Sequence, residues 1–129
     1  MNPSSQQASA VVVLVDDDAA VRDALTFSLE SAGLCVTSFP DAETVLAADL
    51  PTDACFVLDQ RLPGLSGLEA FEVLKARGVR QPTIFITSNP NAVFRRAAAA
   101  HGTPIVEKPL LGDALLEALT RVRGEMTSG

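Results

Sequence analysis

The sequence contains no tryptophan and no tyrosine, and it has only one histidine. Phenylalanine must therefore supply all of the aromatic packing in the core. The two cysteines, Cys35 and Cys55, form no Cys-x-x-Cys pair and have no histidine nearby, which argues against a metal site built on them. We expect both to be buried free thiols of a protein in a reducing, cytoplasmic setting.

Long apolar runs and an excess of basic residues are also missing. No run approaches the ~20 residues that a membrane span requires. The first ten residues lack the basic start and apolar core of a signal peptide. Ten Lys and Arg against sixteen Asp and Glu give a formal net charge of -6. Because nucleic-acid surfaces cluster Lys and Arg, this charge argues against such a surface in this segment.

What remains is the composition of one globular domain, with 47% hydrophobic residues in a chain of 129. We place this domain at residues 10–124. The polar residues 1–9 are expected to form a disordered N-terminal tail, and residues 125–129 a C-terminal tail.

Five apolar runs with strand character alternate with amphipathic segments of helical spacing. The first run, Val11 to Val15, is apolar on both faces, as is typical of a strand inside a parallel sheet. The other runs span Leu34 to Phe39, Ala54 to Leu58, Pro82 to Ile86, and Ile105 to Val106. Strands that alternate with helices predict an α/β fold, with a doubly wound parallel sheet between two layers of helices.

The helix starts carry recognisable caps. Asp18 and Asp41 are predicted N-caps, and Ser66 with Glu69 forms an S-x-x-E capping box. The last two helices are expected at Asn91 to Ala100 and at Leu111 to Val122.

Polar side chains suited to chemistry follow four of the predicted strands. Asp16 and Asp17 follow the first strand, Asp59 the third, Thr87 the fourth and Lys108 the fifth. Ligands of such sheets bind outside the carboxyl ends of the strands. Each residue alone would most simply be a helix cap or a solvated side chain, but their joint placement favours a site.

This set of residues suits phosphoryl transfer. Three neighbouring carboxylates repel one another, and Mg²⁺, which prefers oxygen ligands, removes the conflict. One carboxylate can attack phosphorus, while the metal and Lys108 neutralise charge on the phosphoryl oxygens and Thr87 binds one of them. The sequence offers no Ser-His-Asp set. His101 falls at a predicted helix end, where interaction with the helix dipole explains it.

The chain resembles the receiver domains of two-component response regulators over roughly Val11 to Val122. The resemblance rests on VVVLVDDD, DQRLPGLSG, FIT and EKP taken together. In its details the chain most resembles receivers of nitrogen-fixation-type transcription regulators, although this second resemblance is weaker than the one to the family. It implies a flavodoxin-like fold with five parallel strands in the order 2-1-3-4-5.

The resemblance also implies residue roles. Asp59 would be the phosphoacceptor, with Thr87 and Lys108 assisting. Mg²⁺ would be bound by Asp17, Asp59 and the backbone carbonyl of Arg61, with Asp16 acting through metal-bound water. The Lys108–Pro109 peptide bond would be cis.

The implied partner is a sensor histidine kinase or phosphotransfer protein, which would supply the phosphoryl group from a phosphohistidine. Such a domain is a signalling module that assists only its own phosphorylation and dephosphorylation, not an enzyme. An output domain or a protein partner would bind according to its phosphorylation state. The domain could also form a homodimer through the fourth helix, fifth strand and last helix. The sequence leaves open the kinase, the output, the oligomeric state and whether the domain stands alone.

Three positions depart from the family pattern. Ile105 stands where the family usually has Tyr or Phe, three residues before the lysine. Ser88 replaces a smaller residue after the hydroxyl, and Asn89-Pro90 replaces a more flexible loop. These changes leave the phosphorylation chemistry intact but predict an altered output switch.

Two alternative functions share part of this residue pattern. A haloacid-dehalogenase-type phosphatase also uses an Asp at a strand end, and Asp16 and Asp18 fit its D-x-D-x-[TV] spacing, but Ala20 does not. A phosphorylation-independent, receiver-like binding module would not need the complete set of Asp59, Thr87 and Lys108.

Overall fold

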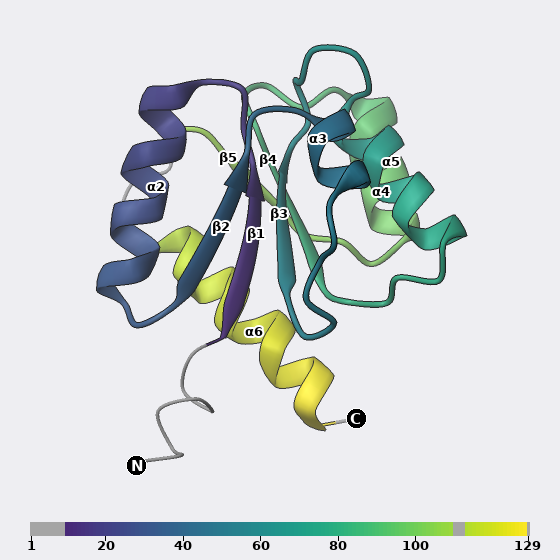
Figure 1. Cartoon of the computed structure of the whole chain (residues 1–129). Helices are drawn as coiled ribbons and strands as arrows, with labels where there is room; N and C mark the ends of the chain where they lie inside the picture. The colour runs from purple at the N-terminus through teal and green to yellow at the C-terminus, as the bar shows by residue number, and fades with distance from the viewer. Residues whose placement is uncertain (1–9, 110–112, 129) are drawn as a thin grey trace.

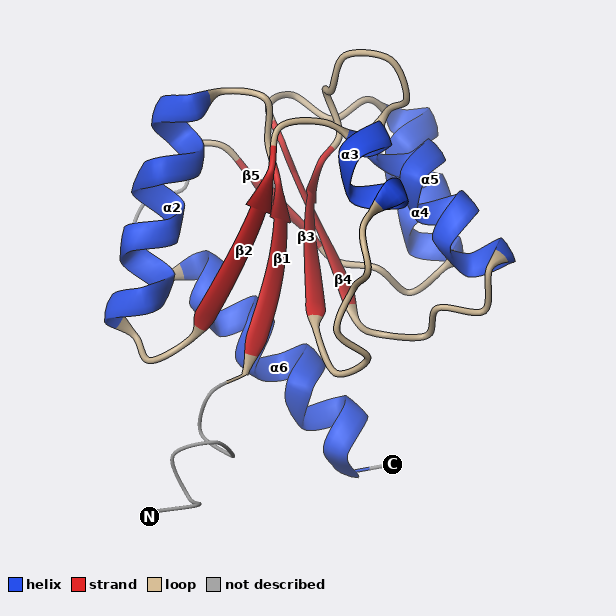
Figure 2. Ribbon diagram, viewed as in Figure 1, coloured by secondary structure: helices blue, strands red, loops and turns tan. Residues whose placement is uncertain are grey.

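The computed structural model describes residues 10–109 and 113–128. The predicted tail at 1–9 and the predicted start of the last helix at Leu111 lie outside the described residues. Five parallel strands form one sheet in the order β2-β1-β3-β4-β5, which confirms the predicted fold class (Figure 2). The strands are β1 (Val11–Val15), β2 (Cys35–Phe39), β3 (Cys55–Asp59), β4 (Thr83–Thr87) and β5 (Ile105–Glu107).

Helices cover both faces of the sheet, as predicted (Figure 1). They are α2 (Ala19–Ser31), α3 (Ala42–Ala47), α4 (Gly67–Ala76), α5 (Ala92–Ala100) and α6 (Ala114–Ser128). One core cluster joins the sheet to α2 and α6, through residues such as Leu29 and Leu119. The other joins it to α3, α4 and α5, through residues such as Val45, Phe71 and Phe94. Two packed layers on a rigid sheet hold the strand ends in place.

The helix caps form as the sequence predicts. The Asp18 carboxylate accepts hydrogen bonds from the backbone N–H groups of Ala20 and Val21, and Asp41 accepts one from Thr44. Ser66 and Glu69 form the complete capping box of α4. These caps satisfy N–H groups that a helix start leaves free, so each helix begins at a defined residue.

Three expectations need correction. Strands β3, β4 and β5 each extend one residue beyond the expected apolar run and end with Asp59, Thr87 and Glu107. Helix α6 continues through Ser128 instead of ending at Val122. Cys55 is buried as expected, but Cys35 is exposed, because it lies on β2, a strand at the edge of the sheet. Within the described residues, none of the helices has both the length and the apolar character to cross a membrane.

Candidate functional site

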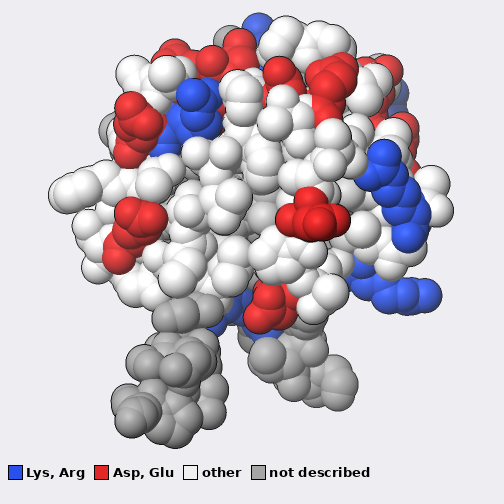
Figure 3. All heavy atoms as spheres, viewed as in Figure 1, with Lys and Arg blue, Asp and Glu red and all other residues white. Residues whose placement is uncertain are grey.

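The structure brings the predicted site residues together at the carboxyl edge of the sheet. Asp16 and Asp17 follow β1, Asp59 and Thr87 end β3 and β4, and Lys108 follows β5. In the face drawn in Figure 3, acidic side chains gather along this upper end of the molecule. Parallel strands that end at one edge thus collect residues far apart in sequence.

Three carboxylates converge in this site. Ligand oxygens of Asp16, Asp17 and Asp59 all lie within 4.8 Å of one another. Asp16 and Asp59 are buried, with 0% and 3% of their surface exposed, whereas Asp17 is exposed. Two fixed, buried carboxylates and one at the solvent boundary form an oxygen-rich group of the kind that hard divalent cations prefer.

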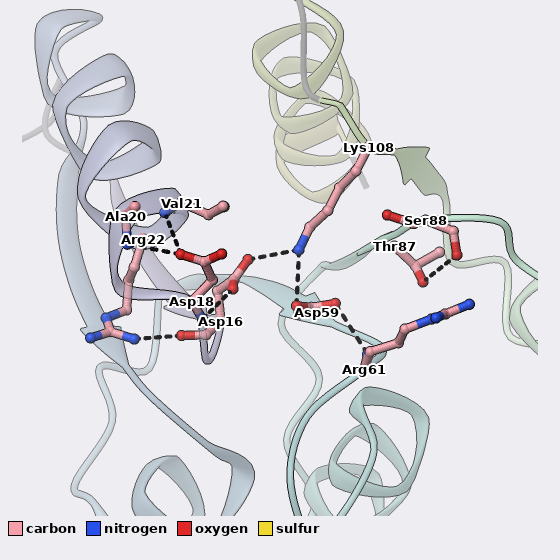
Figure 4. A network of polar contacts seen from close by, with 10 residues as sticks. All are labelled: Asp16, Asp18, Ala20, Val21, Arg22, Asp59, Arg61, Thr87, Ser88 and Lys108. Carbon is pink, nitrogen blue, oxygen red and sulfur yellow. Dashed lines mark hydrogen bonds and ion pairs between the residues drawn. The ribbon is translucent and has the colours of Figure 1, made fainter.

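Lys108 crosses the site and joins the two buried carboxylates (Figure 4). Its Nζ donates to Asp16 Oδ2 at 3.1 Å and to Asp59 Oδ2 at 3.0 Å. The Lys108–Pro109 peptide bond is cis, as expected. A single ammonium group thereby offsets the repulsion between two buried acids.

The environment shifts the protonation equilibria of this pair. Burial raises the pKa of the Asp59 carboxyl above its ordinary 3.8, and the nearby Asp16 adds to the rise. Hydrogen bonds from Lys108 and from the Arg61 backbone oppose it in part. Burial lowers the pKa of Lys108, but hydrogen bonds and charge from Asp59 and Asp16 outweigh burial, so the net pKa lies above 10.5. Lys108 is therefore a cation at neutral pH.

The loop after Asp59 is pinned to the sheet and to α4. The Arg61 N–H donates to Asp59 Oδ1 at 3.1 Å, and the Gln60 N–H donates to the carbonyl of Ile86 at 2.9 Å. A Cβ atom on Gly67 would lie 2.4 Å from the Asp59 carbonyl oxygen, so only glycine fits there. Helix α4 therefore begins directly against the backbone of Asp59.

Thr87 lies beside the site with an uncommitted hydroxyl. It is 1% exposed, and its Oγ1 makes a long hydrogen bond of 3.4 Å to the carbonyl of Ser88. Its backbone carbonyl accepts a hydrogen bond from the Lys108 N–H at 2.8 Å. The hydroxyl thus has only a weak partner within the described residues and can turn to a better acceptor.

Sequence reasoning missed two groups that support the site. Arg22 on α2 donates through Nη1 to the backbone carbonyl of Asp16 at 2.6 Å. The Gln60 side chain accepts a hydrogen bond from the Leu68 N–H at 2.7 Å and helps to cap α4. Both are hydrogen bonds between a side chain and the backbone that depend on tertiary geometry, so no sequence motif predicts them.

His101 lies away from these groups. It is the C-cap of α5, the helix end predicted for it, and its ring packs against Phe71 at a centroid distance of 4.9 Å. It belongs to the packing of α4 and α5.

The site itself combines a buried, hydrogen-bonded carboxylate, a lysine and a cluster of acidic oxygens, which together can accept and hold a phosphoryl group.

Comparisons with known proteins place these features in a family. Residues 12–120 match the model of the response regulator receiver domain. The transcriptional regulatory protein FixJ of Azorhizobium caulinodans is 40% identical over 113 residues, covering 86% of this chain and 54% of FixJ. The transcriptional regulatory protein TdiR of Thauera aromatica is 37% identical over 113 residues, covering 86% of this chain and 50% of TdiR.

A solved structure supports the same assignment. The crystal structure of FixJ-N has a TM-score of 0.79 and 31% sequence identity, covering 88% of this chain and 93% of that one. The chain spans about half the length of the curated relatives it matches.

Proposed function

Because the chain belongs to the response regulator receiver domain family, we propose that Asp59 accepts a phosphoryl group from a phosphohistidine of a sensor kinase or phosphotransfer protein. Receiver domains of transcriptional regulators are signalling modules, not classical enzymes. The observation that carries the proposal is the bridge from Lys108 to Asp59 and Asp16 inside a cluster of three carboxylates.

The transfer would use the Asp59 carboxylate as nucleophile. An oxygen of Asp59 forms a bond to phosphorus as the phosphorus–nitrogen bond of the phosphohistidine breaks, and its electron pair stays on the imidazole. The Lys108 ammonium lies 3.0 Å from Asp59 Oδ2 and supplies positive charge beside the new bond. The Arg61 N–H holds the other oxygen, Oδ1, so the carboxylate presents a fixed orientation.

The residues present fit Mg²⁺. Asp17, Asp59 and the backbone carbonyl of Arg61 would bind the ion. Asp16, whose oxygens accept hydrogen bonds from the Asp18 N–H and from Lys108, would act through metal-bound water. When bound, Mg²⁺ neutralises charge on the phosphoryl oxygens and relieves repulsion among the carboxylates. Thr87 would bind a phosphoryl oxygen in exchange for its weak bond to Ser88.

The proposal extends to the readout. We infer that phosphorylation alters a surface that includes α5, β5 and α6. An output domain, a protein partner or a second copy of the chain would read that surface in the cytoplasm. The relatives are transcriptional regulators about twice as long as the matched segment, which supports an output function outside it.

One observation weakens the phosphatase alternative. The Asp18 carboxylate accepts N–H bonds from Ala20 and Val21 as the N-cap of α2. A phosphatase of the D-x-D type would need this second acid free for proton transfer. The phosphorylation-independent alternative leaves unexplained why Lys108 and two buried acids stay assembled.

Intact mass measurement tests the acceptor. After treatment with acetyl phosphate and Mg²⁺, the parent should gain the mass of one phosphoryl group and Asp59→Asn should gain none. Asp18→Asn is the matched control, because Asn also caps helices and should leave phosphorylation unchanged. Equal gain by Asp59→Asn would disprove the assignment. Turnover of p-nitrophenyl phosphate that Asp18→Asn abolishes would favour the phosphatase.

A further inference from the structure

Arg22 holds the loop that carries two acids of the candidate metal site. Its Nη1 donates to the backbone carbonyl of Asp16 at 2.6 Å, and the side chain is half-buried. Figure 4 shows the guanidinium on the opposite side of this loop from Lys108. Arg22 therefore contacts the backbone of the site from behind and does not enter the pocket.

The bond completes the fixation of Asp16. Its N–H donates to the carbonyl of Phe39 at 3.1 Å, and its two carboxylate oxygens accept from the Asp18 N–H and from Lys108. The carbonyl that Arg22 holds belongs to the planar peptide group between Asp16 and Asp17. Its orientation sets the direction in which the chain enters Asp17, an exposed side chain of the cluster.

The dipole of α2 does not favour a cation at the position of Arg22. The helix begins at Ala19, so Arg22 lies close to its N-terminus, and the first turn holds no acidic residue. Positive charge near a helix N-terminus opposes the helix dipole. The hydrogen bond to Asp16 gives a reason for arginine at this position.

We propose that Arg22 is a positioning residue for divalent cation binding, acting through the Asp16–Asp17 peptide group. This inference rests on the proposed function. The direction in which Mg²⁺ affinity changes when Arg22 is replaced tests the inference. Removing a cation near three carboxylates would, by charge alone, strengthen Mg²⁺ binding. Loss of positioning would weaken it, and groups that orient metal ligands typically contribute about tenfold or more to affinity.

Arg77 provides a matched control. Its Nη1 also donates to a backbone carbonyl at 2.6 Å, that of Leu46, and so joins the end of α4 to α3. Arg77→Met and Arg22→Met each remove a guanidinium and one such bond while keeping an unbranched side chain. Only Arg22→Met should affect the acidic loop.

The experiment measures Mg²⁺ affinity in the parent, Arg22→Met, Arg22→Lys and Arg77→Met. Isothermal calorimetry and amide NMR titration serve, because the chain lacks tryptophan and tyrosine as fluorescent reporters. We expect Arg22→Met to bind Mg²⁺ about tenfold more weakly, Arg22→Lys to fall between it and the parent, and Arg77→Met to match the parent. In metal-free protein, amide shifts of Asp17 and Asp18 should change in Arg22→Met, change less in Arg22→Lys and stay unchanged in Arg77→Met.

Three results would overturn the inference. These are unchanged or tighter Mg²⁺ binding in Arg22→Met, equal weakening in Arg77→Met, and unchanged metal-free shifts at Asp17. If Arg22→Met fails to fold, Arg22→Lys carries the test, and parent-like affinity with parent-like Asp17 shifts would count against positioning. A parent that binds no Mg²⁺ would refute the metal part of the proposed function as well. A parent that binds Mg²⁺ and is phosphorylated, beside an unaffected Arg22→Met, would refute only the role of Arg22.

Discussion

Asp16 and Asp59 are acids that water reaches poorly, and each depends on the groups that replace its hydration. A buried carboxylate without partners is expensive, and breaking a buried pair by removing one member is strongly destabilising. Lys108 serves both acids, with Nζ at 3.1 and 3.0 Å from their oxygens. The same lysine therefore stabilises the unphosphorylated fold and supplies charge for the proposed chemistry.

Asp41 gives a prediction at the residue scale that is independent of the site. Hydrogen bonds with the Thr44 side chain and backbone lower the pKa of its carboxyl below 3.8. A carboxyl with a lowered pKa in the folded state stabilises the fold above pH 3.8, and this contribution is lost as the pH falls through the folded-state pKa. Asp41→Asn keeps a capping side chain but does not titrate.

Asp41→Asn should therefore lose less stability than the parent on acidification. Thermal melts followed by circular dichroism, from about pH 7 to about pH 3, measure the difference. Asp49→Asn, a change at an exposed position just beyond α3, is the control. An identical acid dependence in the parent and Asp41→Asn would show that the cap does not depend on the charge of Asp41.

At the scale of elements, the junction of β3, its loop and α4 is closely packed. The Gly67 N–H donates to the Gln60 carbonyl at 3.1 Å, and Gly67 itself lies against the Asp59 carbonyl. The helix start and the acceptor residue thus share one rigid contact. We expect a change at the start of α4 to displace the Asp59 carboxylate, because Gly67 lies against the Asp59 carbonyl.

Gly67→Ala should both destabilise the domain and slow phosphorylation of Asp59. The added Cβ would meet the Asp59 oxygen at 2.4 Å, and such overpacking typically costs about 1–3 kcal/mol. Gly78→Ala is the control. Gly78 has φ +88° and open space around a built Cβ, so alanine there costs about 1–2 kcal/mol of backbone strain and leaves Asp59 in place.

Urea unfolding and the rate of mass gain with acetyl phosphate separate the two effects. Equal phosphorylation rates in Gly67→Ala and Gly78→Ala would mean that the helix start tolerates the methyl group without moving Asp59.

Elements with local signals could be predicted from the sequence, and features set by tertiary contact could not. The caps at Asp18 and Ser66 form because their hydrogen bonds lie within a few residues. That the residues at the strand ends meet at one edge followed from the alternation of strands and helices, which predicts parallel strands. The prediction that Cys35 is buried was wrong, because the apolar run alone does not distinguish an edge strand from a central one. The bond from Arg22 to Asp16 escaped prediction because it depends on how α2 is rotated against β1.

At the scale of the whole molecule, a cluster of phenylalanine rings links β4 to α4 and α5 on one side of the sheet. The Phe85 ring on β4 packs edge-on against Phe71 of α4 and Phe94 of α5, with centroids 5.6 and 5.0 Å away. Ile105 pairs with Phe85 in the sheet and packs against the same cluster. Phe94, with 4% exposed surface, anchors the first turn of α5 in this cluster. The chain between Thr87 and Phe94 is therefore a short connection between two fixed points.

That connection should carry the signal out of the domain. Asn89 has φ 47°, a left-handed conformation that asparagine adopts more readily than most residues other than glycine, but the following Pro90 restricts Asn89. Ile105 is β-branched, has few χ1 choices and is already packed. When the Thr87 hydroxyl leaves Ser88 for a phosphoryl oxygen, the Ser88 carbonyl loses its partner and the strained segment can rearrange, while Ile105 has no reason to move.

NMR with beryllofluoride and Mg²⁺, which mimic the phosphorylated aspartate, measures this directly. Amide shifts should be large at Thr87 and from Asn89 to Phe94, and the methyl groups of Ile105 should keep their rotamer. Asn89→Gly removes the cost of the positive φ, so it should change the size of the segment's response without affecting phosphorylation of Asp59. A rotamer change at Ile105, together with loss of partner binding in Ile105→Ala, would instead make Ile105 the switch. The aliphatic side chain would then take the part that the family usually gives to an aromatic ring.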